Sequence, residues 1–103
     1  MKIKEGVKLE GVQWQVFHAA LIVETVLETF GVKLVITSCV DGKHMPHSLH
    51  YQGRAFDGRS RDLAPQFQTQ ARDEMKKRLG PDYDVVLEKD HFHIEFQPKT
   101  GSF

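Results

Sequence analysis

Two short segments of the chain carry residue types that bind metal ions and move protons. The first contains His50 and Asp57, seven positions apart, and the second contains Asp90 and His93. Gly53 lies between His50 and Asp57 and lets the backbone turn or approach another segment closely, so that imidazole and carboxylate could converge. Two imidazoles and one carboxylate make the ligand set of a catalytic zinc site, with a fourth position open for water.

The second segment also predicts which of its side chains share a face. In a strand, side chains alternate, so His91, His93 and Glu95 lie on one face while the other face fills the core with Phe92, Ile94 and Phe96. Histidines two positions apart on one face are a frequent metal geometry, and a solvated polar face is the alternative. Asp90 remains as a carboxylate that could take a proton from a zinc-bound water, whose pKa falls from about 15.7 to about 7. Its alternative role is the turn of a hairpin.

These residues also fit a known sequence pattern. The stretch resembles the S-x-H-x-x-G-x-A-x-D motif of the zinc D-Ala-D-Ala metallopeptidases, a group related to the lysostaphin-type endopeptidases and the hedgehog domain. All five fixed positions are present, as Ser48, His50, Gly53, Ala55 and Asp57. The later Asp90-x-x-His93 resembles the acid-x-x-His element that completes the site in that family. The resemblance runs from about Val35 to Phe96 and so covers most of the chain.

The resemblance implies a role for each matched residue. The ligands of one zinc ion would be His50, Asp57 and His93. Asp90 would be the general base that activates water and then protonates the leaving amine, and Ser48 and His91 would contact the substrate. The implied substrates are peptidoglycan stem peptides, often with a D-amino acid at the bond that is cut. Small enzymes of this kind occur among bacteriophage endolysins and bacterial cell-wall hydrolases.

The chain departs from the family pattern in one turn. Many members carry an arginine in a Ser-Gly-Tyr-Arg-like turn before the motif, where it holds substrate and stabilises the developing oxyanion. The corresponding turn here, residues 37–44, contains no arginine. Lys43, His44 or Arg54 could take its place, and we favour His44 as a catalytic residue because it is close in sequence to Ser48. A neutral imidazole is a weaker electrophile than a guanidinium.

Two helices are expected to support these segments. Apolar residues at spacings of three and four predict a helix from Gln13 to Phe30, with Phe17 and Leu21 widening its apolar stripe and Trp14 in the core or a cleft wall. A second helix is predicted from Asp62 to Leu79, with Pro65 in its first turn and Gly80-Pro81 after its end.

The remaining segments read as short strands after an irregular or extended lead-in. They cover residues 32–37, 48–51, 54–57, 84–89 and 92–97, the last two forming a hairpin around Lys89-Asp90. The sequence therefore predicts an α+β domain with a small, mainly antiparallel sheet and helices on one side. The resemblance implies the hedgehog and D-Ala-D-Ala peptidase version of that fold.

Composition limits the class of protein. With 103 residues, the chain is expected to form a single domain over residues 1–103. Fourteen basic and fourteen acidic residues give zero formal net charge, which argues against a nucleic-acid partner. No apolar run has the roughly 20 residues of a membrane helix, and no signal-peptide core follows the N-terminus. We therefore expect a cytoplasmic protein as synthesised, acting on the cell wall after release. Cys39, the single cysteine, is expected to be a buried small hydrophobe.

These observations favour a zinc-dependent peptidase that hydrolyses peptidoglycan stem peptides, as a D-Ala-D-Ala carboxypeptidase or a related endopeptidase. The main alternative keeps the fold and the zinc but uses them for binding without catalysis, as the relationship to the hedgehog domain suggests. A third alternative is a metal-free α+β interaction module, which requires both motifs to be accidental.

Overall fold

The computed structural model describes residues 1–40 and 52–99, which form five strands and two helices. In chain order these elements are β1 (Lys2–Ile3), α1 (Trp14–Thr29), β2 (Val35–Ser38), β3 (Ala55–Arg59), α2 (Pro65–Leu79), β4 (Tyr83–Leu87) and β5 (His91–Phe96). The predicted α+β class is confirmed. The strand predicted over residues 48–51 lies outside the described residues.

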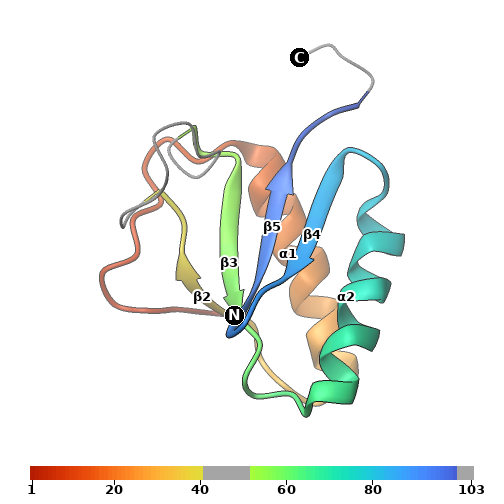
Figure 1. Cartoon of the computed structure of the whole chain (residues 1–103). Helices are drawn as coiled ribbons and strands as arrows, with labels where there is room; N and C mark the ends of the chain where they lie inside the picture. The colour runs from red at the N-terminus through yellow and green to blue at the C-terminus, as the bar shows by residue number, and fades with distance from the viewer. Residues whose placement is uncertain (41–51, 100–103) are drawn as a thin grey trace.

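All five strands join in one sheet with the order β1-β2-β3-β5-β4. Only β1 and β2 pair in parallel; the other three pairs are antiparallel, and β4 and β5 form the predicted hairpin. Both helices pack against the same side of the sheet (Figure 1). The opposite face of β3 and β5 therefore remains available for a site.

Helix α1 covers the centre of the sheet with a stripe of buried side chains, which are Val16, Ala19, Ala20, Val23, Val26 and Leu27. It ends before Gly31, whose φ of 81° is the left-handed conformation that glycine adopts without strain. The prediction was wrong for Phe17 and Leu21, which are 50% and 58% exposed. Trp14 is 70% exposed and so does not lie in the core, the first of the two places predicted for it. The buried arc extends instead to Ala19 and Val26, which are at most 1% exposed.

Helix α2 begins at Pro65, three residues later than predicted, and ends at Leu79 before Gly80, whose φ is 83°. Pro65 occupies the first turn, where its missing N–H group costs no hydrogen bond. Ala71 and Met75 are fully buried. These contacts fix α2 against β4 and α1 and leave its basic C-terminal turn in solvent.

Side-chain alternation divides core from open face along β5, as predicted, and along β3 from Phe56 onward. Phe92 and Ile94 are at most 1% exposed, and Phe56 on β3 is also 1% exposed. The intervening residues of both strands, Asp57, Arg59, His91, His93 and Glu95, are partly exposed. The core thus holds the two strands in place while their polar residues point away from the helices.

The backbone at Gly53, within the motif, approaches a second segment closely. Its φ is 70°, and a Cβ added there would collide with the carbonyl oxygen of Gly11. The Gly53 carbonyl accepts a hydrogen bond from the N–H of Gln13 at 2.8 Å. The close approach expected at this glycine is confirmed, and it ties the motif to the start of α1.

Two further expectations concern single features of the chain. Cys39 is 1% exposed and its thiol lies 3.6 Å from the Ala55 carbonyl oxygen, as expected for a buried small side chain. Across the described residues, neither helix combines the length and the apolar character needed to cross a membrane.

Candidate metal and proton-transfer site

Asp57 and His93 face each other on the open side of the sheet. They are directly paired in the antiparallel register of β3 and β5, although 36 positions separate them in sequence. Asp57 Oδ1 lies 2.9 Å from His93 Nδ1, and the two side chains are only 13% and 20% exposed. Two of the three zinc ligands expected from the sequence therefore meet in a half-buried position.

Glu95 fixes the other side of the His93 ring. Its Oε1 lies 3.0 Å from His93 Nε2, and both side chains are 20% exposed. A neutral imidazole carries one N–H group, so a ring that donates to Glu95 through Nε2 directs the Nδ1 lone pair toward Asp57. A carboxylate behind a histidine is the usual outer partner of a metal-bound imidazole.

The same two carboxylates favour a protonated ring when no cation is bound. Hydrogen bonding to Asp57 raises the pKa of His93 above its usual value, and Glu95 adds to this effect, while burial acts in the opposite direction. A lone pair and a carboxylate oxygen 2.9 Å apart repel each other unless a proton or a cation lies between them. The contact between Asp57 and His93 therefore fits either a protonated His93 ring or a bound cation.

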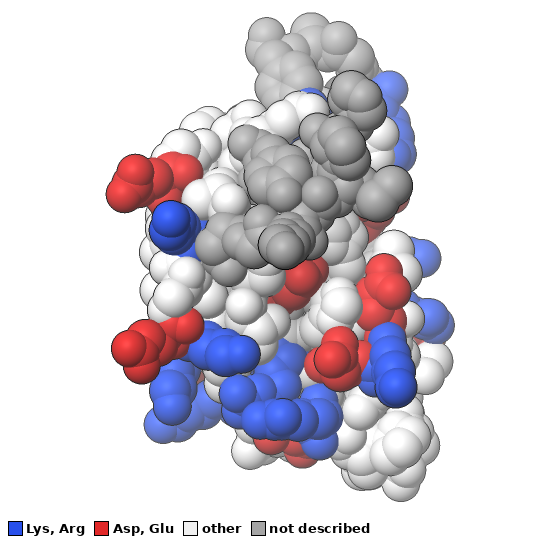
Figure 2. Space-filling model, turned by 60° about the vertical axis from the view of Figure 1, so that its left-hand side comes forward, with Lys and Arg blue, Asp and Glu red and all other residues white. Residues whose placement is uncertain are grey.

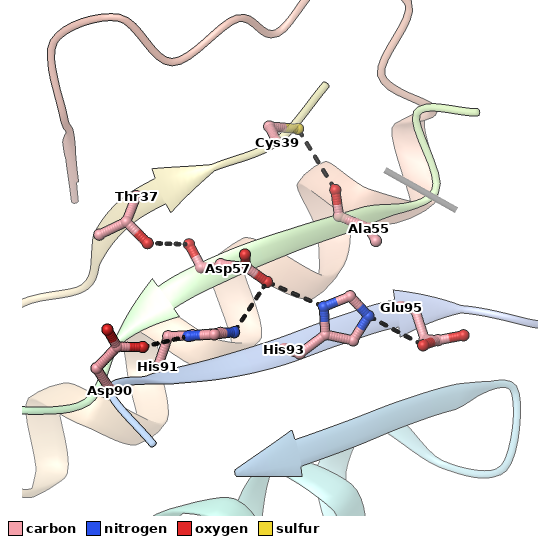
Figure 3. Close-up of polar contacts among 8 residues, drawn as sticks. All are labelled: Thr37, Cys39, Ala55, Asp57, Asp90, His91, His93 and Glu95. Atoms are coloured by element: carbon pink, nitrogen blue, oxygen red, sulfur yellow. Dashed lines mark hydrogen bonds and ion pairs between the residues drawn. The ribbon is translucent and has the colours of Figure 1, made fainter. Parts of the chain in front are cut away.

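His91 lies between this pair and Asp90 (Figure 3). Its Nδ1 lies 2.6 Å from Asp90 Oδ1, and its Nε2 lies 3.8 Å from Asp57 Oδ1. The hydrogen bond with His91 lowers the pKa of Asp90, so that Asp90 is a carboxylate near neutral pH. Asp90 itself is 78% exposed and lies at the hairpin turn. Its connection to Asp57 runs through the His91 ring.

The remaining predicted site residues, His44, Ser48 and His50, lie outside the described residues. Within residues 1–40 and 52–99, no group of three or more His, Cys, Asp and Glu side chains is arranged to hold a metal ion. Asp57 and His93 supply two side chains of the expected ligand set, and His50 remains the predicted third ligand. The structure thus brings together Asp57, Asp90, His91 and His93 and leaves the loop residues as predictions.

Sequence reasoning placed Glu95 on the correct face but gave it no role. The signal was available, because Glu95 lies two positions after a predicted ligand and must share its face. The sequence motifs assign no role to Arg59. It lies two positions after Asp57 and opposite His91 in the register of β3 and β5. Arg54, one of the candidates for the family's missing arginine, precedes β3 and its Nη1 donates to Gln52 at 3.2 Å.

Comparison of the chain with known proteins found no matching family model and no similar curated protein. The resemblance to the D-Ala-D-Ala metallopeptidases therefore depends on the two motifs themselves and on how their residues are placed.

Proposed function

We propose that the protein is a zinc-dependent peptidase of the D-Ala-D-Ala type that hydrolyses peptidoglycan stem peptides. The observation that carries the proposal is the contact between Asp57 and His93, with Glu95 behind the His93 ring. Asp57, His93 and the predicted His50 would hold the ion. Bound zinc supplies a Lewis acid that polarises a peptide carbonyl and makes water more acidic.

Proton transfer in this proposal belongs to Asp90 acting together with His91. When His91 Nδ1 donates to Asp90 at 2.6 Å, its Nε2 is left as a base that faces Asp57. His91 Nε2 would then take a proton from the attacking water and return it to the leaving amine. Asp90 would hold the ring in that tautomer and stabilise its charged form. The general base expected at Asp90 therefore becomes a carboxylate–imidazole pair.

The first experiment measures zinc in purified protein and in three histidine variants. About one zinc ion per chain is expected in the wild-type protein, with loss of zinc in His50→Ala and His93→Ala. His18→Ala is the matched control, because His18 is an exposed residue of α1 on the opposite side of the sheet. Wild-type protein that takes up no zinc at neutral pH would refute the proposal.

The second experiment separates the enzyme from the zinc-containing binding domain. Release of D-alanine from a peptide ending in D-Ala-D-Ala is measured for wild-type protein and for Asp90→Asn and His91→Gln, with zinc content determined in parallel. If the protein is an enzyme, both variants should keep zinc and lose most of their hydrolytic activity. A zinc-loaded wild-type protein that leaves all stem peptides intact would favour the binding domain.

A further inference from the structure

A basic pocket adjoins the candidate zinc site on the open face of the sheet. It is an open cavity of about 410 Å³, lined by Lys4, Thr37, Arg59, Arg61, Asp90 and His91. Small-molecule sites have volumes of roughly 300–1,000 Å³. Because Asp90 and His91 belong to both, the pocket and the candidate zinc site share a wall.

Strand pairing places the pocket two residue pairs beyond the Asp57–His93 pair. Arg59 lies opposite His91 just as Asp57 lies opposite His93, and all four residues are on the same face. Two residues of a strand span about 7 Å, which separates Arg59 from Asp57 along β3. Lys4 reaches the same region because its N–H donates to the Ile36 carbonyl at 2.9 Å, next to Thr37.

The charge of the pocket is positive although the chain as a whole is neutral. Three of its lining residues are basic and only Asp90 is acidic. Arg59 forms only a long ion pair, with its Nη1 4.0 Å from Asp62 Oδ2. Among the described residues, Lys4 and Arg61 form no ion pair. In Figure 2, Lys and Arg side chains gather on the lower part of the molecule. The C-terminal end of β3 lies in the same lower part in Figure 1.

We propose that this pocket binds the free carboxylate of the peptide substrate, so that the protein cleaves the last peptide bond of the chain. The inference rests on the proposed function. Guanidinium groups bind carboxylates through paired, charge-assisted hydrogen bonds. A single negative charge suits a pocket in which Asp90 repels a dianion such as phosphate. The carboxylate of the residue after the scissile bond lies one residue, roughly 3.4 Å, beyond the scissile carbonyl. The pocket adjoins the candidate site closely enough for this short step, because Asp90 and His91 line both.

Binding of a small carboxylate tests the pocket without requiring hydrolysis. N-acetyl-D-alanine and its amide, N-acetyl-D-alaninamide, are titrated into the protein with and without zinc and followed by NMR of the backbone amides. The acid should shift the resonances of Thr37, Arg59 and Arg61, and the amide should not. Arg59→Gln combined with Arg61→Gln should weaken binding of the acid at least tenfold. Arg72→Gln, which changes a partly exposed arginine on α2 that pairs with Asp73, should leave it unchanged.

Arg61→Glu serves as a second variant, because Arg61 is exposed and its replacement leaves the contact between Arg59 and Asp62 intact. It should abolish binding of the acid. Binding that is equal for acid and amide, or that survives in both arginine variants, would overturn the proposal.

Hydrolysis provides an independent readout. If the protein releases D-alanine, the arginine variants should lose at least tenfold in kcat/KM for a peptide ending in a free carboxylate and little for the same peptide with a terminal amide. An equal loss for both peptides would overturn the carboxylate pocket and leave the peptidase intact. A protein that binds no zinc and cleaves nothing, but binds N-acetyl-D-alanine through Arg59 and Arg61, would refute the peptidase and retain the carboxylate site.

Discussion

Glu95 offers a direct test of whether β5 prepares His93 to bind a metal ion. Its carboxylate lies 3.0 Å from Nε2 of His93, and its second oxygen, Oε2, lies 3.2 Å from the side-chain nitrogen of Gln97 when that amide faces it. Glu95 is therefore held in place independently of His93. If His93 binds zinc through Nδ1, removing Glu95 should leave the ring free to rotate and make its nitrogen less basic.

The expected magnitude follows from the loss of one charge-assisted hydrogen bond behind a ligand. Replacing such outer partners weakens metal binding by about 10–100-fold, which corresponds to about 1.4–2.8 kcal/mol. Glu95→Ala should raise the zinc Kd toward the upper end of that range. Glu95→Gln keeps a neutral acceptor for the N–H of His93 and should raise the Kd by only about tenfold, because hydrogen bonds to charged groups are roughly twice as strong.

The assay is competition for zinc between the protein and a chromophoric chelator, with Asp84→Asn as the matched control. Asp84 lies opposite Glu95 in the β4–β5 register and pairs with Lys99 at 3.2 Å, so its replacement removes one charge from the same face without touching His93. The control should change the Kd by no more than about twofold. Equal losses in Glu95→Ala and Asp84→Asn would refute the reasoning, because the effect would then be one of general charge.

Three further predictions concern stability and ionisation. Gly53→Ala should lower the free energy of unfolding by about 1–3 kcal/mol from backbone strain alone, with more from the collision with Gly11, as measured by urea denaturation. Ser60→Ala should be neutral or raise the melting temperature, because the buried Ser60 hydroxyl has no hydrogen-bond partner in the described structure; a loss above about 1 kcal/mol would contradict this. Burial raises the pKa of Tyr83, whose hydroxyl donates to the Gln15 carbonyl at 3.0 Å. The stabilisation from this phenol should therefore be complete below pH 10 and should be lost as pH rises through the raised pKa. The absorbance of phenolate that is present in the wild type and missing in Tyr83→Phe should accordingly appear only above pH 10.

The helices and the hairpin could be predicted from sequence because their signals are local. Apolar spacing located α1 to within one residue at each end, and Gly31 and Gly80 marked helix ends through their backbone conformation. The width of the buried arc was not predictable, since the exposure of Trp14 depends on where the sheet lies and not on helix periodicity.

The candidate site was predictable only in its parts. Alternation along β5 placed His91, His93 and Glu95 on one face without any knowledge of the neighbouring strand. The pairing of Asp57 with His93 needs the register of two strands 36 positions apart, which no local pattern contains. The basic pocket could not be predicted from sequence for the same reason, because Lys4 is brought to it only by the parallel pairing of β1 with β2.

The alternation of β5, and of β3 from Phe56 onward, allows the polar residues of the open face to change separately from the stability of the protein. Core side chains occupy positions 56, 92 and 94, and every residue of the site and the pocket on these strands occupies an odd-numbered position from 57 to 59 or from 91 to 95. Substitutions at these odd positions would exchange the proposed metal ligands or the charges of the pocket without opening a cavity among the aromatic residues. A lineage of such domains could therefore gain or lose a metal site, reverse the charge of the pocket or acquire a new ligand while the same sheet folds beneath.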